Sequence, residues 1–164
     1  MLNIGIVGAG VGGLSCALML KKLGHKVTIF EKQSKLISSG VGIQLSSNAI
    51  RILRLFDLED NIARVANFPL MVDCINGHNG KKITSIPLGK IAEKKFNAGF
   101  YQLHRNDLIS ILKNKVEDFG IKINYGSPVN NLTQNSSNAK IQLLNQNYNY
   151  DSVSYTHLTL PTTR

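Results

Sequence analysis

The residues best suited to chemistry form a glycine-rich run near the N-terminus and an acidic residue that follows it. Gly8, Gly10 and Gly13 have GxGxxG spacing, and Glu31 lies about 20 residues further on. In this pattern the first glycine permits a tight turn, the second lets a pyrophosphate approach the backbone, and the third allows a helix to pack closely on a strand. The acidic residue accepts hydrogen bonds from ribose hydroxyls. The spacing therefore predicts a dinucleotide site, with a purely structural glycine turn as the alternative.

The segments on either side of the glycines have the patterns of a strand, a helix and a second strand. Residues 3–7 are a β-branched run typical of a buried parallel strand, and residues 12–23 have apolar positions at helical spacing. Gly24 follows as a helix stop, and residues 27–30 have the composition of a strand. This order favours a dinucleotide-binding unit over a structural turn. It does not separate FAD from NAD, because both carry an adenosine ribose and a pyrophosphate.

The bulk composition is that of one globular domain. The chain has 164 residues, of which 43% are hydrophobic and 18% charged, and this length favours a single domain. No segment has the length and apolarity of a membrane span, and the N-terminus lacks the basic flank and apolar core of a signal peptide. We therefore expect a cytoplasmic protein without a membrane partner.

The formal net charge of +9 raises the question of nucleic-acid binding. The basic residues are scattered in pairs such as Lys21-Lys22, Lys81-Lys82 and Lys94-Lys95, without one dense stripe or interleaved aromatic residues. We interpret them as solvated faces and expect no nucleic-acid partner. A basic surface can still steer an anionic substrate or a nicotinamide dinucleotide toward the protein.

Two cysteines, Cys16 and Cys74, stand alone in the sequence. Neither belongs to a CxxC pair, and no histidine lies at metal-ligand spacing from them. We therefore expect neither a metal site nor a disulfide, and we interpret both cysteines as small buried residues.

The rest of the chain alternates between helical and strand patterns. Ser46, Ser47 and Asn48 offer side chains that cap a helix, and Asn106 is a candidate cap for a helix over residues 107–119. Turn residues at 76–80 predict a hairpin. The expected elements are, in order, a helix after residue 48, a short helix within 57–66, hairpin strands at 70–75 and 82–86, a strand at 100–104, the helix at 107–119, and strands at 121–124, 129–133 and 139–144.

Three separated stretches carry a resemblance to a known family. The first is residues 8–13 with Glu31, the second is residues 40–53, similar to the pattern GAGIxLxPNAxRxL, and the third joins Ile86-Pro87-Leu88-Gly89 to an HRxDL-like run at residues 104–108. On these stretches the chain resembles the class A flavoprotein monooxygenases, the single-component aromatic hydroxylases such as salicylate hydroxylase and 6-hydroxynicotinate 3-monooxygenase. The second and third stretches favour FAD over NAD as the bound cofactor.

The resemblance implies an α/β fold, a Rossmann-like FAD-binding domain of the GR2 type in which a parallel sheet carries an inserted β-hairpin. It also implies FAD as cofactor, NADH or NADPH as co-substrate, and hydroxylation of a small, electron-rich aromatic substrate of the salicylate type. The cofactor carries the difficult step, so no acid and base pair is required of the sequence. The oligomeric state is left open.

The site residues implied by the resemblance extend the glycine motif. The arginine of HRxDL contacts the flavin cofactor in the family, so Arg105 takes that role, with an arginine that merely ends a strand in solvent as the alternative. His104 beside it is expected to be structural. The expected cofactor-binding residues are Gly8, Gly10, Gly12, Gly13, Leu14, Glu31 at the ribose, Lys32 toward the adenine, Val41 and Gly42 at the mouth of the site, Gln44, and Arg105.

Two positions depart from the family pattern. Gln44 stands where the 6-hydroxynicotinate enzymes have a histidine proposed as a base, and a glutamine does not accept a proton at neutral pH. We expect Gln44 to hydrogen-bond flavin or substrate, and we assign no other catalytic residue. Ser47 replaces a proline, and we expect it to cap the helix with little consequence.

The C-terminal residues change in character at Val153. The run at residues 153–162 is reproduced by one reading frame of a common sequencing adapter, so we expect residues 153–164 to be a non-native tail that does not continue the fold. Residues 1–152 are then an incomplete FAD-binding domain that ends before the substrate domain and is inactive alone. The alternatives are another FAD-dependent oxidoreductase, such as a ubiquinone-pathway hydroxylase or an isoprenoid reductase, and a non-catalytic dinucleotide-binding module.

Overall fold

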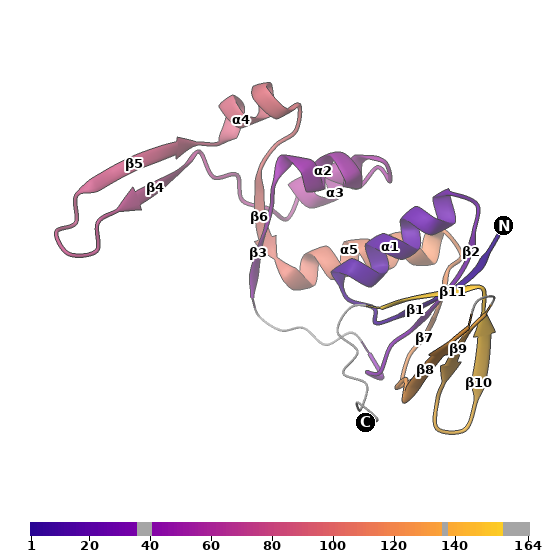
Figure 1. Cartoon of the computed structure of the whole chain (residues 1–164). Coiled ribbons are helices and arrows are strands. Elements are labelled where there is room, and N and C mark those ends of the chain that lie inside the picture. The colour runs from indigo at the N-terminus through magenta and orange to yellow at the C-terminus, as the bar shows by residue number, and fades with distance from the viewer. Residues whose placement is uncertain (36–40, 136–137, 156–164) are drawn as a thin grey trace. The chain divides into compact units, whose positions relative to one another are not determined.

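The computed structural model describes residues 1–35, 41–135 and 138–155. The chain divides into two compact units, one made of residues 1–38 and 112–164 and the other of residues 39–111 (Figure 1). The division falls inside helix α5 (Arg105–Asp118). The prediction of one FAD-binding domain over residues 1–152 remains a prediction, and each unit is described by itself.

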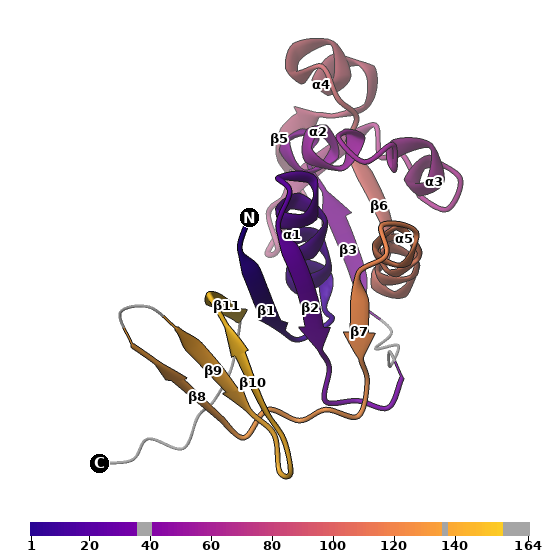
Figure 2. The ribbon, with the colours of Figure 1, turned by 90° about the vertical axis from the view of Figure 1, so that its right-hand side faces the viewer.

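The first unit is built on a parallel sheet with strand order β11-β1-β2-β7. Figure 2 shows β1, β2 and β7 side by side. Helix α1 (Val11–Lys22) connects β1 to β2 and contacts both. The bounds of the four strands are Asn3–Val7 for β1, Lys26–Phe30 for β2, Lys122–Asn124 for β7 and Ser152–Tyr155 for β11. The predicted strand, helix and strand order is confirmed.

Helix α1 ends as its sequence predicts. Gly24 has a φ of +86°, which a residue with a side chain adopts only at a cost. Its N–H donates to the Lys21 carbonyl at 3.0 Å, and the His25 N–H donates to the Leu20 carbonyl at 3.1 Å. These two bonds form a Schellman motif, which satisfies carbonyls at the end of the helix and directs the chain into β2.

An antiparallel meander completes the first unit. Its strands are β8 (Asn131–Gln134), β9 (Ala139–Gln142) and β10 (Asn147–Tyr150). Ile141 and Tyr150 are buried in one cluster with Phe30 of β2. A Cβ on Gly5 would lie 2.6 Å from Ile141 Cδ1 and 2.9 Å from Tyr150 Cδ2. The absence of a side chain at Gly5 therefore lets the meander lie directly against β1.

The expectation that the chain stops following the fold at Val153 is wrong for residues 153–155. They belong to β11, which pairs in parallel with β1 from Ile4↔Ser152 to Val7↔Tyr155. Asp151 sets this register, because its N–H donates to the Asn3 carbonyl at 2.9 Å and its Oδ2 accepts from the Asn3 N–H at 2.6 Å. Backbone pairing needs little from the side chains, so a short Ser-Val-Ser-Tyr run suffices. Residues 156–164 lie outside the described residues, and the non-native origin of residues 153–164 stays a prediction.

The second unit contains an antiparallel pair, β3 (Gly42–Leu45) with β6 (Tyr101–His104), and helices α2 (Ser47–Arg54) and α3 (Glu59–Ala63). Its core includes Ile50, Leu53, Phe56, Ile62 and Leu103. The predicted hairpin is confirmed as β4 (Met71–Ile75) and β5 (Lys82–Pro87), and it leads into α4 (Gly89–Phe96).

Two predicted helix caps are wrong. Helix α5 begins at Arg105, directly after β6, so Asn106 lies within its first turn, and its Oδ1 is buried without a partner among the described residues. At α2 the N-cap is Ser46, but no side chain caps the helix, and the Ser46 hydroxyl donates to the Asn48 side chain instead. Ser47 occupies the first helical position, where proline also fits, and its buried hydroxyl donates to the Ala98 carbonyl at 2.8 Å. Of these polar side chains, only that of Ser47 is engaged by a contact with a distant part of the chain.

The remaining expectations concern membranes, metals and cysteines. Among the helices of the described residues, none is both long and apolar enough to cross a bilayer. The same ranges contain no cluster of three or more His, Cys, Asp or Glu side chains that could hold a metal ion. Cys16 and Cys74 are free thiols of intermediate burial, so the prediction that both are buried is wrong.

Candidate functional site

The turn between β1 and α1 brings two of the motif glycines into close contact. Gly8 has a φ of +100°, and its N–H donates to the Phe30 carbonyl at 2.8 Å. A Cβ on Gly13 would lie only 2.0 Å from the Gly8 carbonyl oxygen. Because real Cβ atoms do not approach an oxygen so closely, α1 packs on this turn only with glycine at position 13. The structural roles predicted for both glycines are confirmed.

The N-terminus of α1 is open to an anion. Its N-cap, Gly10, is extended and offers no side chain, and the first turn holds no acidic residue. The N–H groups at the start of a helix have no partner within the helix, and the helix dipole adds a partial positive charge there. The amides of Val11, Gly12 and Gly13 are therefore placed to bind a phosphate group.

Glu31 is buried at the end of β2, with only 9% of its surface exposed. Its Oε2 accepts a hydrogen bond from the Ala9 N–H at 2.7 Å, and its Oε1 accepts one from the Gln33 N–H at 2.9 Å. A carboxylate can accept about two hydrogen bonds at each oxygen, and the described residues supply one to each. The side chain can hold the turn after β1 and still accept from ribose hydroxyls. Lys32, the next residue, is exposed.

The other predicted site residues gather at one end of the β3 and β6 pair in the second unit. The Arg105 N–H donates to the Val41 carbonyl at 3.0 Å, and Gly42 is paired with His104. The half-buried Arg105 side chain has no carboxylate partner within the described ranges. Its guanidinium is thus available to a ligand, and its backbone position does not depend on its side chain.

A hollow of about 610 Å³ lies beside this end of the β3 and β6 pair. It is lined by polar residues together with the apolar Ile43, Val65 and Leu103; the polar and glycine positions are Gly42, Gln44, Asn67, Gln102, His104 and Asp107. Gln44 is a predicted site contact, and Asn67 and Gln102 line the same hollow although the sequence analysis does not name them. Side chains two residues apart in a strand lie on the same face, so Gln102 shares a face with His104. This spacing could have identified Gln102 from the sequence.

The predicted residues thus fall into two groups. Gly8, Gly10, Gly12, Gly13, Leu14, Glu31 and Lys32 lie in the first unit, around the β1 turn and the end of β2. Val41, Gly42, Gln44 and Arg105 lie in the second unit. The structure brings together the members of each group, and their binding roles remain predictions.

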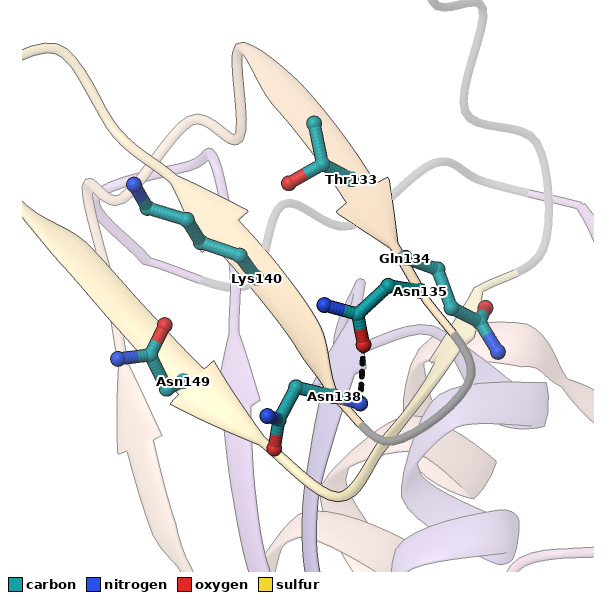
Figure 3. A pocket seen from close by; sticks show the side chains of 6 residues that line it. All are labelled: Thr133, Gln134, Asn135, Asn138, Lys140 and Asn149. Carbon is teal, nitrogen blue, oxygen red and sulfur yellow. Dashed lines mark hydrogen bonds between the residues drawn. The ribbon is translucent and has the colours of Figure 1, made fainter.

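A second hollow, of about 410 Å³, lies on the β8 to β10 meander (Figure 3). Its lining consists of neutral polar side chains and Lys140, with the Asn138 N–H donating to Asn135 Oδ1 at 2.7 Å across the turn. It combines neither a nucleophile with a base nor a carboxylate pair. We therefore interpret it as a hydrated outer face of the sheet.

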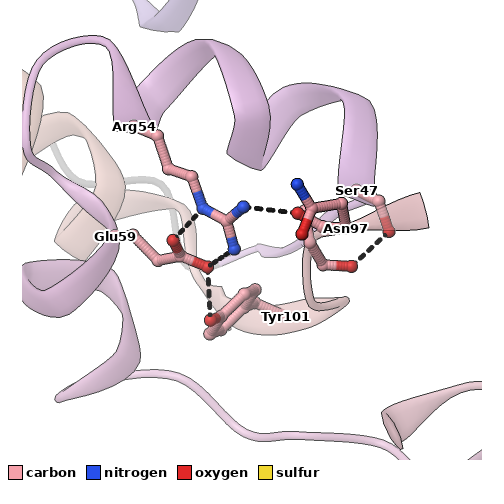
Figure 4. A network of polar contacts seen from close by, with 6 residues as sticks. Ser47, Arg54, Glu59, Asn97 and Tyr101 are labelled. Atoms are coloured by element: carbon pink, nitrogen blue, oxygen red, sulfur yellow. Dashed lines mark hydrogen bonds and ion pairs between the residues drawn. The ribbon is translucent and has the colours of Figure 1, made fainter. Parts of the chain in front are cut away.

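A polar network joins α2, α3 and β6 (Figure 4). Glu59 accepts from Arg54 Nη2 at 2.8 Å and from the Tyr101 hydroxyl at 3.0 Å. The Arg54 hydrogen bond lowers the pKa of Glu59. Burial, and then the hydrogen bond to Glu59, raises the pKa of Tyr101 to about 12. This network holds elements together and faces no hollow that the predicted site uses.

A glycine turn, an uncapped helix start and a buried acid at the end of the next strand define a dinucleotide-binding domain of the α/β class. The sequence matches the FAD binding domain family over residues 1–154, and the chain belongs to this family. The predicted fold class and the predicted cofactor, FAD, are confirmed.

Curated relatives of the chain are monooxygenases. The chain is 36% identical to 3-amino-4-hydroxybenzoate 2-monooxygenase of Streptomyces cremeus over 107 residues. This aligned segment covers 65% of the chain and 27% of the relative. It is 30% identical over 116 residues to 6-hydroxynicotinate 3-monooxygenase of Pseudomonas fluorescens, covering 71% of the chain and 30% of the relative. The chain therefore spans less than a third of the length of these relatives.

Solved structures share the fold. A crystal structure of CtdE in complex with FAD and a substrate superposes with a TM-score of 0.83 at 23% identity, over 95% of this chain and 37% of that one. The tetrameric form of 2-methyl-3-hydroxypyridine-5-carboxylic acid oxygenase superposes with a TM-score of 0.77 at 21% identity, over 92% and 38%. At these identities the likeness concerns the fold.

Proposed function

We propose that the chain is the N-terminal FAD-binding part of a longer, cytoplasmic NAD(P)H-dependent monooxygenase that hydroxylates a small aromatic ring. The observation that carries the proposal is the uncapped start of α1 beside the buried Glu31 carboxylate, in a chain of the FAD binding domain family. The names of its relatives support a monooxygenase reaction on a ring that bears hydroxyl and carboxylate groups.

Different residues of the chain bind different parts of FAD. The amides of Val11, Gly12 and Gly13 bind the pyrophosphate, which is the part of FAD that a helix start recognises best. Glu31 accepts from the ribose hydroxyls, and Lys32 lies on the adenine side of that ribose. Further contacts come from the backbone of Gly8, Gly10, Leu14, Val41 and Gly42, the amide of Gln44, and the guanidinium of Arg105 on a phosphate oxygen.

Bound FAD supplies electron transfer from NAD(P)H and the activation of oxygen. The chain contributes binding and orientation, and its apolar side chains keep water from the cofactor. Gln44 is neutral at all physiological pH values, so it orients a ring through hydrogen bonds and does not remove a proton. We expect the 164-residue chain alone to be inactive.

The test uses the polypeptide encoded by the complete source gene, purified with FAD. A monooxygenase is expected to be yellow and to oxidise NADH or NADPH faster when its aromatic substrate is added, with a hydroxylated product in matching amount. A colourless protein, or one whose NAD(P)H oxidation no aromatic acid stimulates, would contradict the proposal. Stimulation by a quinone precursor or an isoprenoid would instead indicate the related oxidoreductases. A gene product that ends near residue 152 and binds FAD without turnover would indicate a binding module.

A further inference from the structure

The turn between β4 and β5 contains the only two Asn-Gly pairs of the sequence, Asn76-Gly77 and Asn79-Gly80. An asparagine before glycine loses its side-chain amide when the backbone nitrogen of the glycine attacks the side-chain carbonyl carbon, Cγ. Glycine leaves this approach open because it has no Cβ. The two pairs share one turn, and their sequence gives no reason for them to differ. The hydrogen bonds of the turn distinguish them.

Both asparagine side chains are held close to the nitrogen that would attack them. The His78 N–H donates to Asn76 Oδ1 at 2.9 Å, and the Lys81 N–H donates to Asn79 Oδ1 at 3.0 Å. Each bond closes an Asx turn, which folds the side chain back over the following peptide group. The N–H donor also stabilises the negative charge that develops on Oδ1 during the attack. The two side chains are therefore similarly placed, and the glycine nitrogens decide which pair reacts.

The two glycine nitrogens differ in their hydrogen bonds. The Gly80 N–H donates to the Asn76 carbonyl at 2.9 Å. The exposed Gly77 has no acceptor for its N–H in the part of the chain that the structure describes. A backbone nitrogen attacks only after it has lost its proton. Gly80 must therefore give up a hydrogen bond before it reacts, whereas Gly77 loses its proton directly to solvent.

The bond from Gly80 also acts on Gly77. Its acceptor, the Asn76 carbonyl oxygen, belongs to the same peptide group as the Gly77 nitrogen. A hydrogen bond accepted at the oxygen polarises a peptide group, and this makes its N–H a stronger donor and a stronger acid. One hydrogen bond therefore protects the Gly80 nitrogen and activates the Gly77 nitrogen.

We propose that Asn76 is a site of spontaneous deamidation in the folded chain and that Asn79 is protected from it. The deprotonated Gly77 nitrogen forms a bond to Cγ of Asn76, and the bond from Cγ to the side-chain nitrogen breaks. That nitrogen takes a proton from solvent and leaves as ammonia. Water then opens the cyclic imide, at Cγ to give aspartate or at the backbone carbonyl to give isoaspartate. The sum is hydrolysis of one amide, with no change in oxidation state.

The two products affect the hairpin differently. Aspartate keeps an oxygen that accepts from the His78 N–H, so the turn is retained. Isoaspartate inserts a methylene group into the main chain, between the Asn76 N–H, which donates to the Lys81 carbonyl at 2.9 Å, and the carbonyl that accepts from Gly80. We therefore expect isoaspartate to loosen the end of the hairpin. Either product places a carboxylate beside Lys81 and Lys82.

The experiment follows both sites in the 164-residue chain during incubation at mildly alkaline pH, by peptide mapping with mass spectrometry. In the folded chain we expect Asn76 to react at least fivefold faster than Asn79. This ratio corresponds to about 1 kcal/mol, which is the usual net contribution of one hydrogen bond. In the chain unfolded by guanidinium chloride, the two rates are expected to agree within twofold. The Gly77 amide is also expected to exchange its hydrogen at least fivefold faster than the Gly80 amide in the folded chain.

Two variants test the mechanism without disturbing the strands. Gly77→Ala obstructs the attack with a Cβ that meets no described atom within 4 Å, so it is expected to slow the reaction of Asn76 at least tenfold and to leave Asn79 within twofold. His78→Ala removes the imidazole that lies between the two pairs but keeps the backbone N–H. It is expected to leave both rates within twofold, whereas a fivefold loss at Asn76 would assign the preference to the imidazole and overturn the role of the hydrogen bond.

The comparison of folded and unfolded chains decides the inference. Equal rates in the folded chain, or a faster reaction at Asn79, would overturn it. The same preference for Asn76 in the unfolded chain would also overturn it, because sequence neighbours would then be the cause. The reaction involves neither FAD nor an aromatic substrate, so its outcome is independent of the proposed function.

Discussion

The Oε2 oxygen of Glu31 accepts a hydrogen bond from the backbone N–H of Ala9 at 2.7 Å, which ties the end of β2 to the turn after β1. The same carboxylate that we propose for the ribose therefore also shapes the turn that receives the pyrophosphate. A change at Glu31 is expected to affect both binding and stability.

Glu31→Gln tests this dual role. The variant replaces one carboxylate oxygen by an NH₂ group that faces an N–H donor, so one charge-assisted hydrogen bond is lost. Such bonds contribute about 1.5 to 3 kcal/mol, and we expect the Kd of FAD to rise about tenfold or more. The free energy of unfolding in urea is expected to fall by about 1 to 2 kcal/mol. An unchanged Kd, measured by quenching of flavin fluorescence, would remove Glu31 from the cofactor site.

Gly13→Ala tests the close approach of α1 to the turn. The new Cβ would lie 2.0 Å from the Gly8 carbonyl oxygen, so the helix must shift. We expect a loss of about 2 kcal/mol or more in urea unfolding, at the upper end of overpacking effects, together with weaker FAD binding. Gly77→Ala is the matched control, because a methyl group at that position would meet no described atom within 4 Å, and it is expected to change stability by less than about 0.5 kcal/mol. Equal stability of both variants would show that the contact is not needed.

Arg105→Ala tests whether its guanidinium serves the ligand. The side chain has no carboxylate partner in the described ranges, and the backbone bond to Val41 survives the change. We expect FAD affinity to fall about tenfold, as for loss of a charge-assisted bond, with the melting temperature nearly unchanged. Arg51→Ala, at an exposed arginine of the same unit, is the control and is expected to leave FAD affinity unaltered. If both variants bind FAD like the parent, Arg105 merely ends a strand.

Tyr101 gives the fold an alkaline sensitivity. Burial and the bond to Glu59 raise its pKa to about 12, whereas an unfolded tyrosine has a pKa of about 10. The folded state thus holds this proton more tightly, so the contribution is complete below about pH 10 and is lost as the pH rises toward about 12. In the Tyr101→Phe variant, the urea concentration at the midpoint of unfolding is expected to fall less between about pH 10 and about pH 12 than in the parent. Burial also raises the pKa values of Tyr125 and Tyr150. Both tyrosines are present in the parent and in the variant, so they contribute equally to the loss of stability in each. A parallel loss in parent and variant would contradict the assignment.

Deletion variants test where the fold ends. Removal of residues 156–164 is expected to leave the melting temperature unchanged. Removal of residues 152–164 also deletes β11 and uncovers the edge of β1, so we expect a decrease of about 4 °C or more. Equal melting temperatures for the two deletions would show that β11 adds nothing to the sheet.

Local signals made the conformation of the turn between β1 and α1 predictable. Gly8, Gly13 and Gly24 act within a few residues of their own positions, through a positive φ or a close approach to the neighbouring turn. The position of Glu31 is predictable because one helix and one strand separate it from the glycines. The resemblance to the flavoprotein monooxygenases then supplied the choice of FAD, which the glycine spacing alone does not make.

Contacts between distant residues were not predictable from the sequence. Gly5 is required by Ile141 and Tyr150, which lie more than a hundred positions later in the chain. The bridge that brings Asn67 beside Gln102 joins an irregular segment to a strand. The sequence around Asn67 has no strand periodicity from which this bridge could be predicted. The failed cap at Ser47 has the same cause, since its hydroxyl donates to the carbonyl of Ala98, about fifty positions later in the chain.

The most direct test of the central claim is an NMR titration of the ¹⁵N-labelled chain with FAD. We predict saturable shifts of the backbone amides of Ala9, Val11 to Gly13 and Gln33, with a higher Kd in the Glu31→Gln variant. Shifts confined to the β8 to β10 meander, or shifts that Glu31→Gln leaves unchanged, would contradict the assignment of this turn as the FAD site.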